Sequence, residues 1–166
     1  MPRDGIVGEL ERFWKYVVRG PGIEDCWLWS GAVGDDGYGR FWTKQDAGRQ
    51  RTMRPQRFLY RELTGIDLPP EVMLLHRCDI PICVHVDLDP RLTHVRLGNA
   101  RLNQQDASHA GRHRNRFTVE PFASAGRAER VARSRRLRDA VRSHGWNPDE
   151  FSRALSAGGD NQPGLW

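Results

Sequence analysis

The stretch from residue 74 to residue 106 constrains the fold of this chain most. An apolar run at 72–75 predicts a short buried strand that ends at His76. A polar segment follows, and residues 95–97 predict a second short strand. Asn99 is then the expected N-cap of a helix. Two short strands followed directly by a helix indicate an α+β fold.

Four residues in and near this stretch have the chemistry of zinc ligands. Cys78 and Cys83 lie between the two predicted strands, His94 directly precedes the second, and Cys26 heads an earlier strand. Three thiolates and one imidazole are a standard closed set for structural zinc, and they would use all 3 cysteines of the chain. An odd number of cysteines without a secretion signal argues against disulfides. We therefore predict a structural Zn²⁺ that supplies folding energy, the alternative being that Cys78 and Cys83 are only small buried residues.

Two further residues suit the chemistry of phosphoryl transfer. His76 lies two residues before Cys78, so a zinc ion held there would fix the backbone that aims its imidazole. A neutral imidazole can deprotonate water for in-line attack on phosphorus. Asn103, on the predicted helix, offers an amide oxygen that suits Mg²⁺ or Mn²⁺, with waters and a phosphate completing the coordination.

Upstream, the sequence predicts a helix, paired strands and a second helix. Apolar spacing predicts a helix over 5–19. A hairpin is expected from 26 to 42, with its turn at 34–37. A second hairpin or a loop spans 44–53, and Pro55 begins a short helix.

Downstream, the composition changes to a basic linker and a helical pair. The helix after Asn99 is expected to end at Gly111. Further helices are predicted at 127–143 and from the Asn147 cap to Gly158; this pair could dock on the core, on DNA or on another subunit. The chain is thus divided into an N-terminal helix at 1–23, a zinc-stabilised core at 24–112, a basic linker at 113–126, a C-terminal helical pair at 127–158 and a flexible tail at 159–166.

The charge of the chain favours a polyanionic partner. The net charge is +5 and the isoelectric point is near 9.6. Nearly all basic residues are arginines, which suit bidentate contacts to phosphate and guanine. A GC-rich genome, whose codons favour arginine, is the alternative explanation. The residues expected to contact double-stranded DNA are Arg40, Arg49, Arg51, Arg54, Arg112 and Arg114.

The sequence argues against membrane and secreted classes. No apolar run approaches the roughly 20 residues that a membrane span requires. The first residues lack the order of charge, apolar run and cleavage site that marks a signal peptide. We expect a cytoplasmic protein without a membrane partner.

The combined pattern resembles the His-Me finger (HNH-type) endonucleases, in the branch of the His-Cys box and phage homing enzymes. Members of that branch carry a CWxW-GYGRF hairpin, an HRxxY helix start, and HxCxNxxCxNPxHL followed by an Asn-bearing helix. The resemblance covers about residues 24–112 and implies a ββα-metal fold. The matching segments are Cys26-Trp27-Leu28-Trp29, Gly37-Tyr38-Gly39-Arg40-Phe41, Arg57-Phe58-Leu59-Tyr60, His76-Arg77-Cys78-Asp79, Pro81, Cys83, His94 and Asn103.

This resemblance implies a metal-dependent endonuclease that hydrolyses phosphodiester bonds of DNA. It also implies a protein encoded by a bacterium, or by a phage and active in the host cytoplasm. It implies His76 as the general base and Asn103 as a ligand of Mg²⁺. It also implies an arginine near the scissile phosphate, for which Arg40 and Arg57 are the candidates. The implied structural zinc ligands are Cys26, Cys78, Cys83 and His94.

Departures from the family pattern bear on these assignments. In the family the last ligand follows the second cysteine by five residues, whereas the segment from Cys83 to His94 is expanded here. His85 is therefore a rival zinc ligand, and His94 is preferred because its spacing to Asn103 matches the family. Gln56 stands where the family has a histidine, which removes an auxiliary catalytic group.

Residues 161–166 offer a separate binding motif. They are similar to the short Gln-x-x-Leu-aromatic peptides with which bacterial replication proteins dock into the sliding clamp. The expected anchors are Gln162, Leu165 and Trp166. The alternative is that Leu165 and Trp166 fold back on the core of the protein.

Other functions stay open at this point. A non-catalytic, zinc-stabilised DNA-binding protein would use His76 only structurally, and a ribonuclease could use the same site. Retention of both His76 and Asn103 favours the nuclease, because binding alone needs neither. A cutter of palindromes would be a homodimer, whereas a nicking or homing enzyme could act as a monomer.

Overall fold

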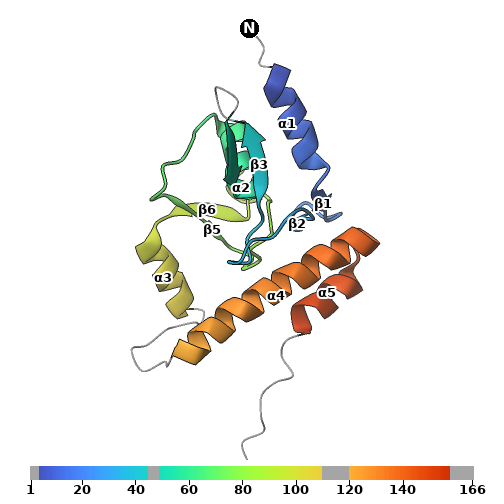
Figure 1. Ribbon diagram of the computed structural model, residues 1–166, viewed down its shortest axis with the longest axis vertical. Helices are drawn as coiled ribbons and strands as arrows, with labels where there is room; N and C mark the ends of the chain where they lie inside the picture. Colours follow the sequence, from blue (N-terminus) through green and yellow to red (C-terminus); the bar gives the residue numbers. More distant parts are fainter. Residues whose placement is uncertain (1–3, 45–48, 110–119, 158–166) are drawn as a thin grey trace, which may run out of the picture.

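The computed structural model describes residues 4–44, 49–109 and 120–157. Its strands pair into three antiparallel two-stranded sheets, β1–β2, β3–β4 and β5–β6, which confirms the α+β class. No helix in the described ranges is long and apolar enough to cross a membrane. In chain order (Figure 1) the elements are α1 (Asp4–Trp14), β1 (Val17–Arg19), β2 (Trp27–Trp29), β3 (Phe41–Lys44), β4 (Gln50–Met53), α2 (Pro55–Thr64), β5 (Met73–His76), β6 (Val95–Gly98), α3 (Ala100–His109), α4 (Glu120–His144) and α5 (Pro148–Ser156).

Aromatic rings from four elements form the centre of the core. Phe13 of α1 lies 5.1 Å from Phe58 of α2 and 5.6 Å from Phe41 of β3, measured between ring centroids. Trp29 of β2 lies 5.5 Å from Phe13 and 5.6 Å from Phe41. All four side chains are buried, and several meet edge to face, which adds to the stabilisation from burial. These rings join α1, β2, β3 and α2 into one unit.

Local sequence signals fix where several helices begin and end. Pro55 occupies the first turn of α2, and Gly65 ends this helix in the left-handed conformation at φ 73°. The Asn147 side chain accepts hydrogen bonds from two backbone N–H groups at the start of α5. Asn99 accepts a hydrogen bond of 3.0 Å from the first turn of α3. The caps predicted at Asn99 and Asn147 are therefore confirmed.

The predicted helix over 5–19 is wrong in its last part. The helix α1 ends at Trp14, and residues 17–19 form β1, which pairs antiparallel with β2. Val17 and Val18 continue the helical spacing in the sequence, but β-branched residues also favour strands. Pairing with a distant strand decides between the two.

The predicted hairpin from 26 to 42 is also wrong. The partner of β2 is β1, and the partner of β3 is β4, so the second hairpin expected at 44–53 is the real one. The turn at 34–37 forms, but it closes only an isolated bridge between Val33 and Gly39. The turn residues therefore correctly predict a reversal of the chain, but the flanking segments do not pair as two β-strands.

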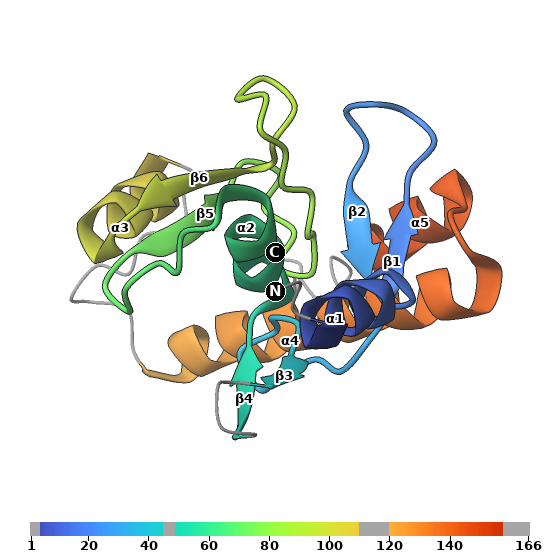
Figure 2. The same cartoon turned by 90° about the horizontal axis from the view of Figure 1, so that it is seen from above.

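The C-terminal helices dock on the core. Figures 1 and 2 show α4 running along one side of the molecule, with α5 packed beside it. Leu137 and Val141 of α4 and Ala154 of α5 belong to the main hydrophobic cluster. The helix α4 begins at Glu120, so the linker predicted at 113–126 is helical from 120 onward. Residues 113–119, and the tail at 159–166, lie outside the described residues.

Arginines of α4 bind two loops of the core. Arg127 donates to the Asp35 carboxylate at 2.8 Å, and Arg130 donates to the Asp36 carbonyl oxygen at 3.0 Å. Arg133 donates to the carbonyl oxygen of Asp79 at 3.2 Å. Residues three apart lie on one side of a helix, so these side chains form a row directed at the core.

A substitution at Gly37 can test how closely α4 packs on the turn at 34–37. Gly37 has a φ of +83°, and a Cβ there would lie 3.2 Å from Cγ and 3.3 Å from the carbonyl oxygen of Arg130. We expect Gly37→Ala to lower the free energy of unfolding by about 1–3 kcal/mol, from left-handed strain plus crowding. Urea unfolding measures this change.

Gly65→Ala is the matched control, because Gly65 has a φ of +73° and no atom within 4 Å of the added Cβ. This variant should show the left-handed strain alone, roughly 1 kcal/mol. The Gly37 variant should be the less stable of the two. Equal losses would contradict the close packing of α4 on the turn.

Candidate metal centre

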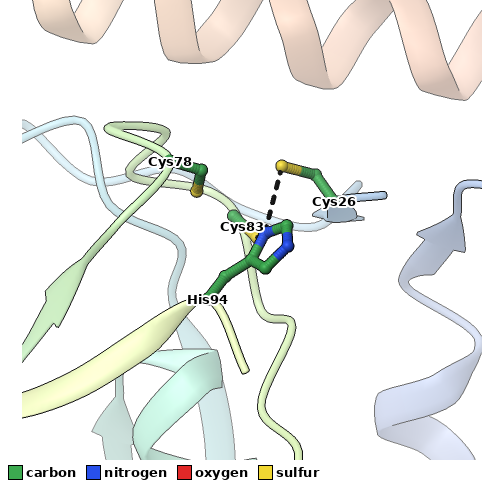
Figure 3. Close-up of side chains that lie close together, drawn as sticks. All are labelled: Cys26, Cys78, Cys83 and His94. Carbon is green, nitrogen blue, oxygen red and sulfur yellow. Dashed lines mark hydrogen bonds between the residues drawn. The ribbon is translucent and has the colours of Figure 1, made fainter. Parts of the chain in front are cut away.

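Cys26, Cys78, Cys83 and His94 converge on one point (Figure 3). Their ligand atoms all lie within 4.8 Å of one another. Nδ1 of His94 is 3.5 Å from Sγ of Cys26 and 3.5 Å from Sγ of Cys83. A tetrahedral zinc with Zn–S bonds of about 2.3 Å and Zn–N bonds of about 2.0–2.1 Å separates sulfur from nitrogen by about 3.5–3.6 Å. The cluster is therefore compatible with a structural zinc.

Backbone pairing brings these ligands together from distant positions. Cys83 forms an isolated bridge with Leu28 of β2, and Val84 N–H donates to the Trp27 carbonyl oxygen at 2.7 Å. The ligand loop thus lies along β2, and Cys26 directly precedes this strand. His94 directly precedes β6, and its backbone N–H donates to the carbonyl oxygen of His85 at 2.9 Å.

Hydrogen bonding selects the nitrogen of His94 that faces the cysteines. Its Nε2 lies 3.0 Å from the carbonyl oxygen of Glu24. A carbonyl oxygen can only accept, so Nε2 carries the proton and the Nδ1 lone pair points at the sulfurs. A second partner of this kind commonly orients a metal-binding histidine.

His85, the rival ligand, supports the cluster from outside. Its Nδ1 donates to the Asp25 carbonyl oxygen at 2.7 Å, and its ring stacks on Trp27 with centroids 4.1 Å apart. The ring also lies 4.4 Å from that of His94 and is buried. Among the described residues, His94 and not His85 completes the four-ligand cluster.

The three thiols influence one another strongly. Hydrogen bonds from Cys26 and Cys83 lower the pKa of Cys78 to about 2. The hydrogen bond to Cys78 is the largest cause that raises the pKa of Cys26 to about 12, and burial raises the pKa of Cys83. A divalent cation at the centre would stabilise all three as thiolates.

His76 lies beside this cluster at the end of β5. Its Nε2 is 2.9 Å from the carbonyl oxygen of Cys83, so Nε2 is the protonated nitrogen and Nδ1 keeps a free lone pair. Its ring stacks near Tyr38, with centroids 6.0 Å apart and an interplanar angle of 28°. Burial lowers the pKa of His76, although the charge of Cys78 and the bond to Cys83 act in the opposite direction.

Asn103 lies in the first half of α3, the helix that follows β6 and packs against it. Its backbone N–H donates to the carbonyl oxygen of Asn99 at 2.9 Å. Asn103 is exposed.

Arg57 is bound within the fold. Its guanidinium donates to the carbonyl oxygens of Val72 at 2.6 Å, of Pro69 at 3.1 Å and of Leu68. Burial is the largest cause that lowers its pKa. These contacts brace the segment that leads into β5, so they use the donors that a phosphate would need.

Arg40 and Arg54 share one carboxylate. Asp36 lies 2.9 Å from Arg40 and 3.1 Å from Arg54. The guanidinium of Arg54 also lies over the ring of Tyr38, 3.8 Å from its centroid. Burial raises the pKa of Asp36, but hydrogen bonds and both arginines outweigh it and the pKa is lowered. Two arginines for one acid leave a positive charge next to Tyr38, whose ring stacks near His76.

The remaining predicted residues are arginines on or next to β4, or lie outside the described residues. Arg49 is exposed next to β4, and Arg51 lies 3.7 Å from Asp67. The residues on which the structure gives no description are Arg112, Arg114, Gln162, Leu165 and Trp166.

Sequence reasoning assigned no role to Asp36 or Tyr38. The four-residue spacing from Asp36 to Arg40 was a usable signal for an ion pair, although in a turn it is less specific than in a helix. Glycines on both sides of Tyr38 also indicated a backbone under close packing. Neither signal predicted that Arg54 contacts both Asp36 and the ring of Tyr38.

Fold and site together define an α+β protein with a Cys₃His cluster of zinc type. Comparison with known proteins found two similar proteins of Escherichia phage T7. Protein 7.7 is 32% identical over 90 residues, which are 54% of this chain and 60% of that protein. Protein 2.8 is 26% identical over 87 residues, 52% of each chain. The matches thus span between about half and three fifths of these relatives. No family model and no solved structure matches the chain.

The choice between the two histidines can be tested by metal content. We expect His94→Gln to lose bound zinc and to unfold readily, because three thiolates then lack their fourth ligand. His85→Gln, the control, should keep about one zinc per chain while losing some stability. Elemental analysis after gel filtration measures both. Zinc retained in the His94 variant and lost in the His85 variant would contradict the assignment.

Proposed function

We propose that this protein is a metal-dependent DNA endonuclease of the His-Me finger (HNH) type with a structural zinc. The observation that carries the proposal is the state of His76. Its Nε2–H donates to the Cys83 carbonyl oxygen, so its Nδ1 lone pair is available as a base. Cys83 is also a ligand of the candidate zinc cluster, which would hold the acceptor rigidly.

The order of elements supports the proposal. The antiparallel pair β5–β6 is followed directly by α3, with His76 paired to Val95 and Asn103 on the helix. This arrangement agrees with a ββα-metal core, in which strand and helix residues jointly serve one phosphate. The similarity to phage T7 proteins favours a phage-encoded protein that acts in the host cytoplasm.

In the proposed reaction His76 Nδ1 takes a proton from water as the water attacks phosphorus. Asn103 offers its amide oxygen to Mg²⁺ or Mn²⁺, which when bound would stabilise the charge of the phosphate and of the leaving 3′ oxygen. Arg40 and Arg54 meet at Asp36, and Arg54 lies over the Tyr38 ring that stacks near His76. Their positive charge would attract the DNA backbone. Arg54 suits the phosphate better than Arg57, whose guanidinium binds backbone carbonyls.

The first test is nicking of supercoiled plasmid and of a randomised duplex library with Mg²⁺ or Mn²⁺. We expect wild type to nick and His76→Ala to be slower by at least about 100-fold, as for loss of a general base. His144→Ala, on an exposed histidine at the end of α4, should nick like wild type.

Equal nicking by the His76→Ala variant would contradict the assignment of the base. Salt-sensitive binding without cutting of any substrate would favour the alternative, a zinc-stabilised DNA-binding protein. Parallel digestion of RNA separates the endonuclease from a ribonuclease.

Asn103→Ala should raise the Mg²⁺ concentration for half-maximal nicking by about tenfold or more, because an inner ligand is removed. Asn103→Asp keeps an oxygen ligand and should retain most of the metal response. Gln105→Ala changes another exposed residue of α3 and should behave as wild type. An unchanged Mg²⁺ titration of Asn103→Ala would show that Asn103 is no ligand.

A further inference from the structure

We propose that Tyr38 is a positioning residue of this site, whose ring holds Arg54 beside His76 so that the guanidinium meets a phosphate of the DNA. The inference rests on the proposed endonuclease function and adds to it a residue that acts by holding Arg54.

The ring of Tyr38 contacts both groups. The Arg54 guanidinium carbon lies 3.8 Å from the ring centroid, well inside the range of cation–π attraction. The His76 ring stacks at 6.0 Å. One side chain therefore lies against both the proposed base and the Arg54 guanidinium.

The backbone of Tyr38 is fixed on both sides. A Cβ on Gly39 would lie 2.7 Å from Cδ1 of Trp29 and 2.8 Å from Cγ of Pro55, so this residue is packed without space against β2 and α2. On the other side, Gly37 packs on Arg130 of α4. The ring thus stands on a segment that cannot shift without disturbing the core.

Asp36 orients the ring and the cation together. One carboxylate oxygen accepts from the Tyr38 backbone N–H at 3.1 Å, and the other lies 3.1 Å from Arg54. Because Asp36 also binds Arg40 at 2.9 Å, it neutralises only part of the charge. The Arg54 side chain remains 33% exposed, so its guanidinium is held in place and still accessible to an anion.

Ordinary core packing does not explain Tyr38. Its side chain is half-buried, and it stands outside the hydrophobic cluster formed by the described residues. An aromatic residue with a core role would contact apolar neighbours, whereas this ring contacts a guanidinium and an imidazole.

The test compares Tyr38→Leu with Tyr38→Phe in the full-length, zinc-loaded protein, with plasmid and library nicking as above. Tyr38→Leu removes the ring and should lower the nicking rate at saturating DNA about tenfold. Tyr38→Phe keeps the ring and should stay within about twofold of wild type. Tyr16→Leu, which removes a ring packed on Trp29 away from the site, is the control and should nick like wild type.

A double variant separates positioning from a general structural effect. If Tyr38 acts through Arg54, Tyr38→Leu combined with Arg54→Met should be no slower than Arg54→Met alone. The ring proton signals of His76 in NMR spectra should move in Tyr38→Leu and stay in Tyr38→Phe. Zinc content and thermal unfolding check that each variant is folded. If Tyr38→Leu does not fold, the role of Tyr38 is supported when folded Arg54→Met nicks slowly and Tyr38→Phe nicks like wild type.

Wild-type rates in Tyr38→Leu or in Arg54→Met would overturn the role of Tyr38 while leaving the endonuclease intact. Independent, multiplying losses in the double variant would overturn it as well. A wild-type protein that cuts no substrate would instead overturn the proposed function, and the role of Tyr38 with it.

Discussion

The Cys₃His cluster is a point at which segments of the fold that share no common sheet converge. A two-stranded hairpin is only marginally stable alone, and the described residues contain three hairpins that do not form a common sheet. Ligands from the residue before β2, from the loop after β5 and from the residue before β6 meet within 4.8 Å. A zinc ion there would join two hairpins and their loop at one point, and the aromatic core beside Trp29 would join the third.

The cluster and the candidate catalytic residue are coupled through Cys83. Its sulfur belongs to the cluster, and its carbonyl oxygen accepts the hydrogen bond from His76. A change in the position of the sulfur would therefore move the acceptor that fixes the imidazole tautomer. A cysteine variant would therefore affect both metal binding and the orientation of His76, and the two effects would be hard to separate. Variants of His76 leave all four ligands in place.

Predictions from local sequence signals are correct where neighbouring residues determine the structure. They are wrong or incomplete where a partner distant in the sequence determines it. The strand ending at His76, the caps at Asn99 and Asn147 and the four residues of the cluster follow from residue type and spacing. The segment at 17–19 was misassigned because its valines fit a helix or a strand, and only its partner β2 distinguishes them. Arg57 was one of two arginines predicted near a scissile phosphate, and the sequence could not show that its guanidinium donates to carbonyl oxygens of the segment before β5.

The distribution of arginines shows why net charge alone says little about a polyanion site. Arg127, Arg130 and Arg133 donate to the loops under α4, and Arg57 donates to the segment before β5, so these charges serve the fold. Around Asp36 the arrangement differs, since one carboxylate faces two arginines. The excess charge there arises from geometry rather than from composition, and it lies beside the only described histidine whose ring stacks on a tyrosine. Local charge balance, rather than the total of +5, therefore shows where positive charge is left over among the described residues.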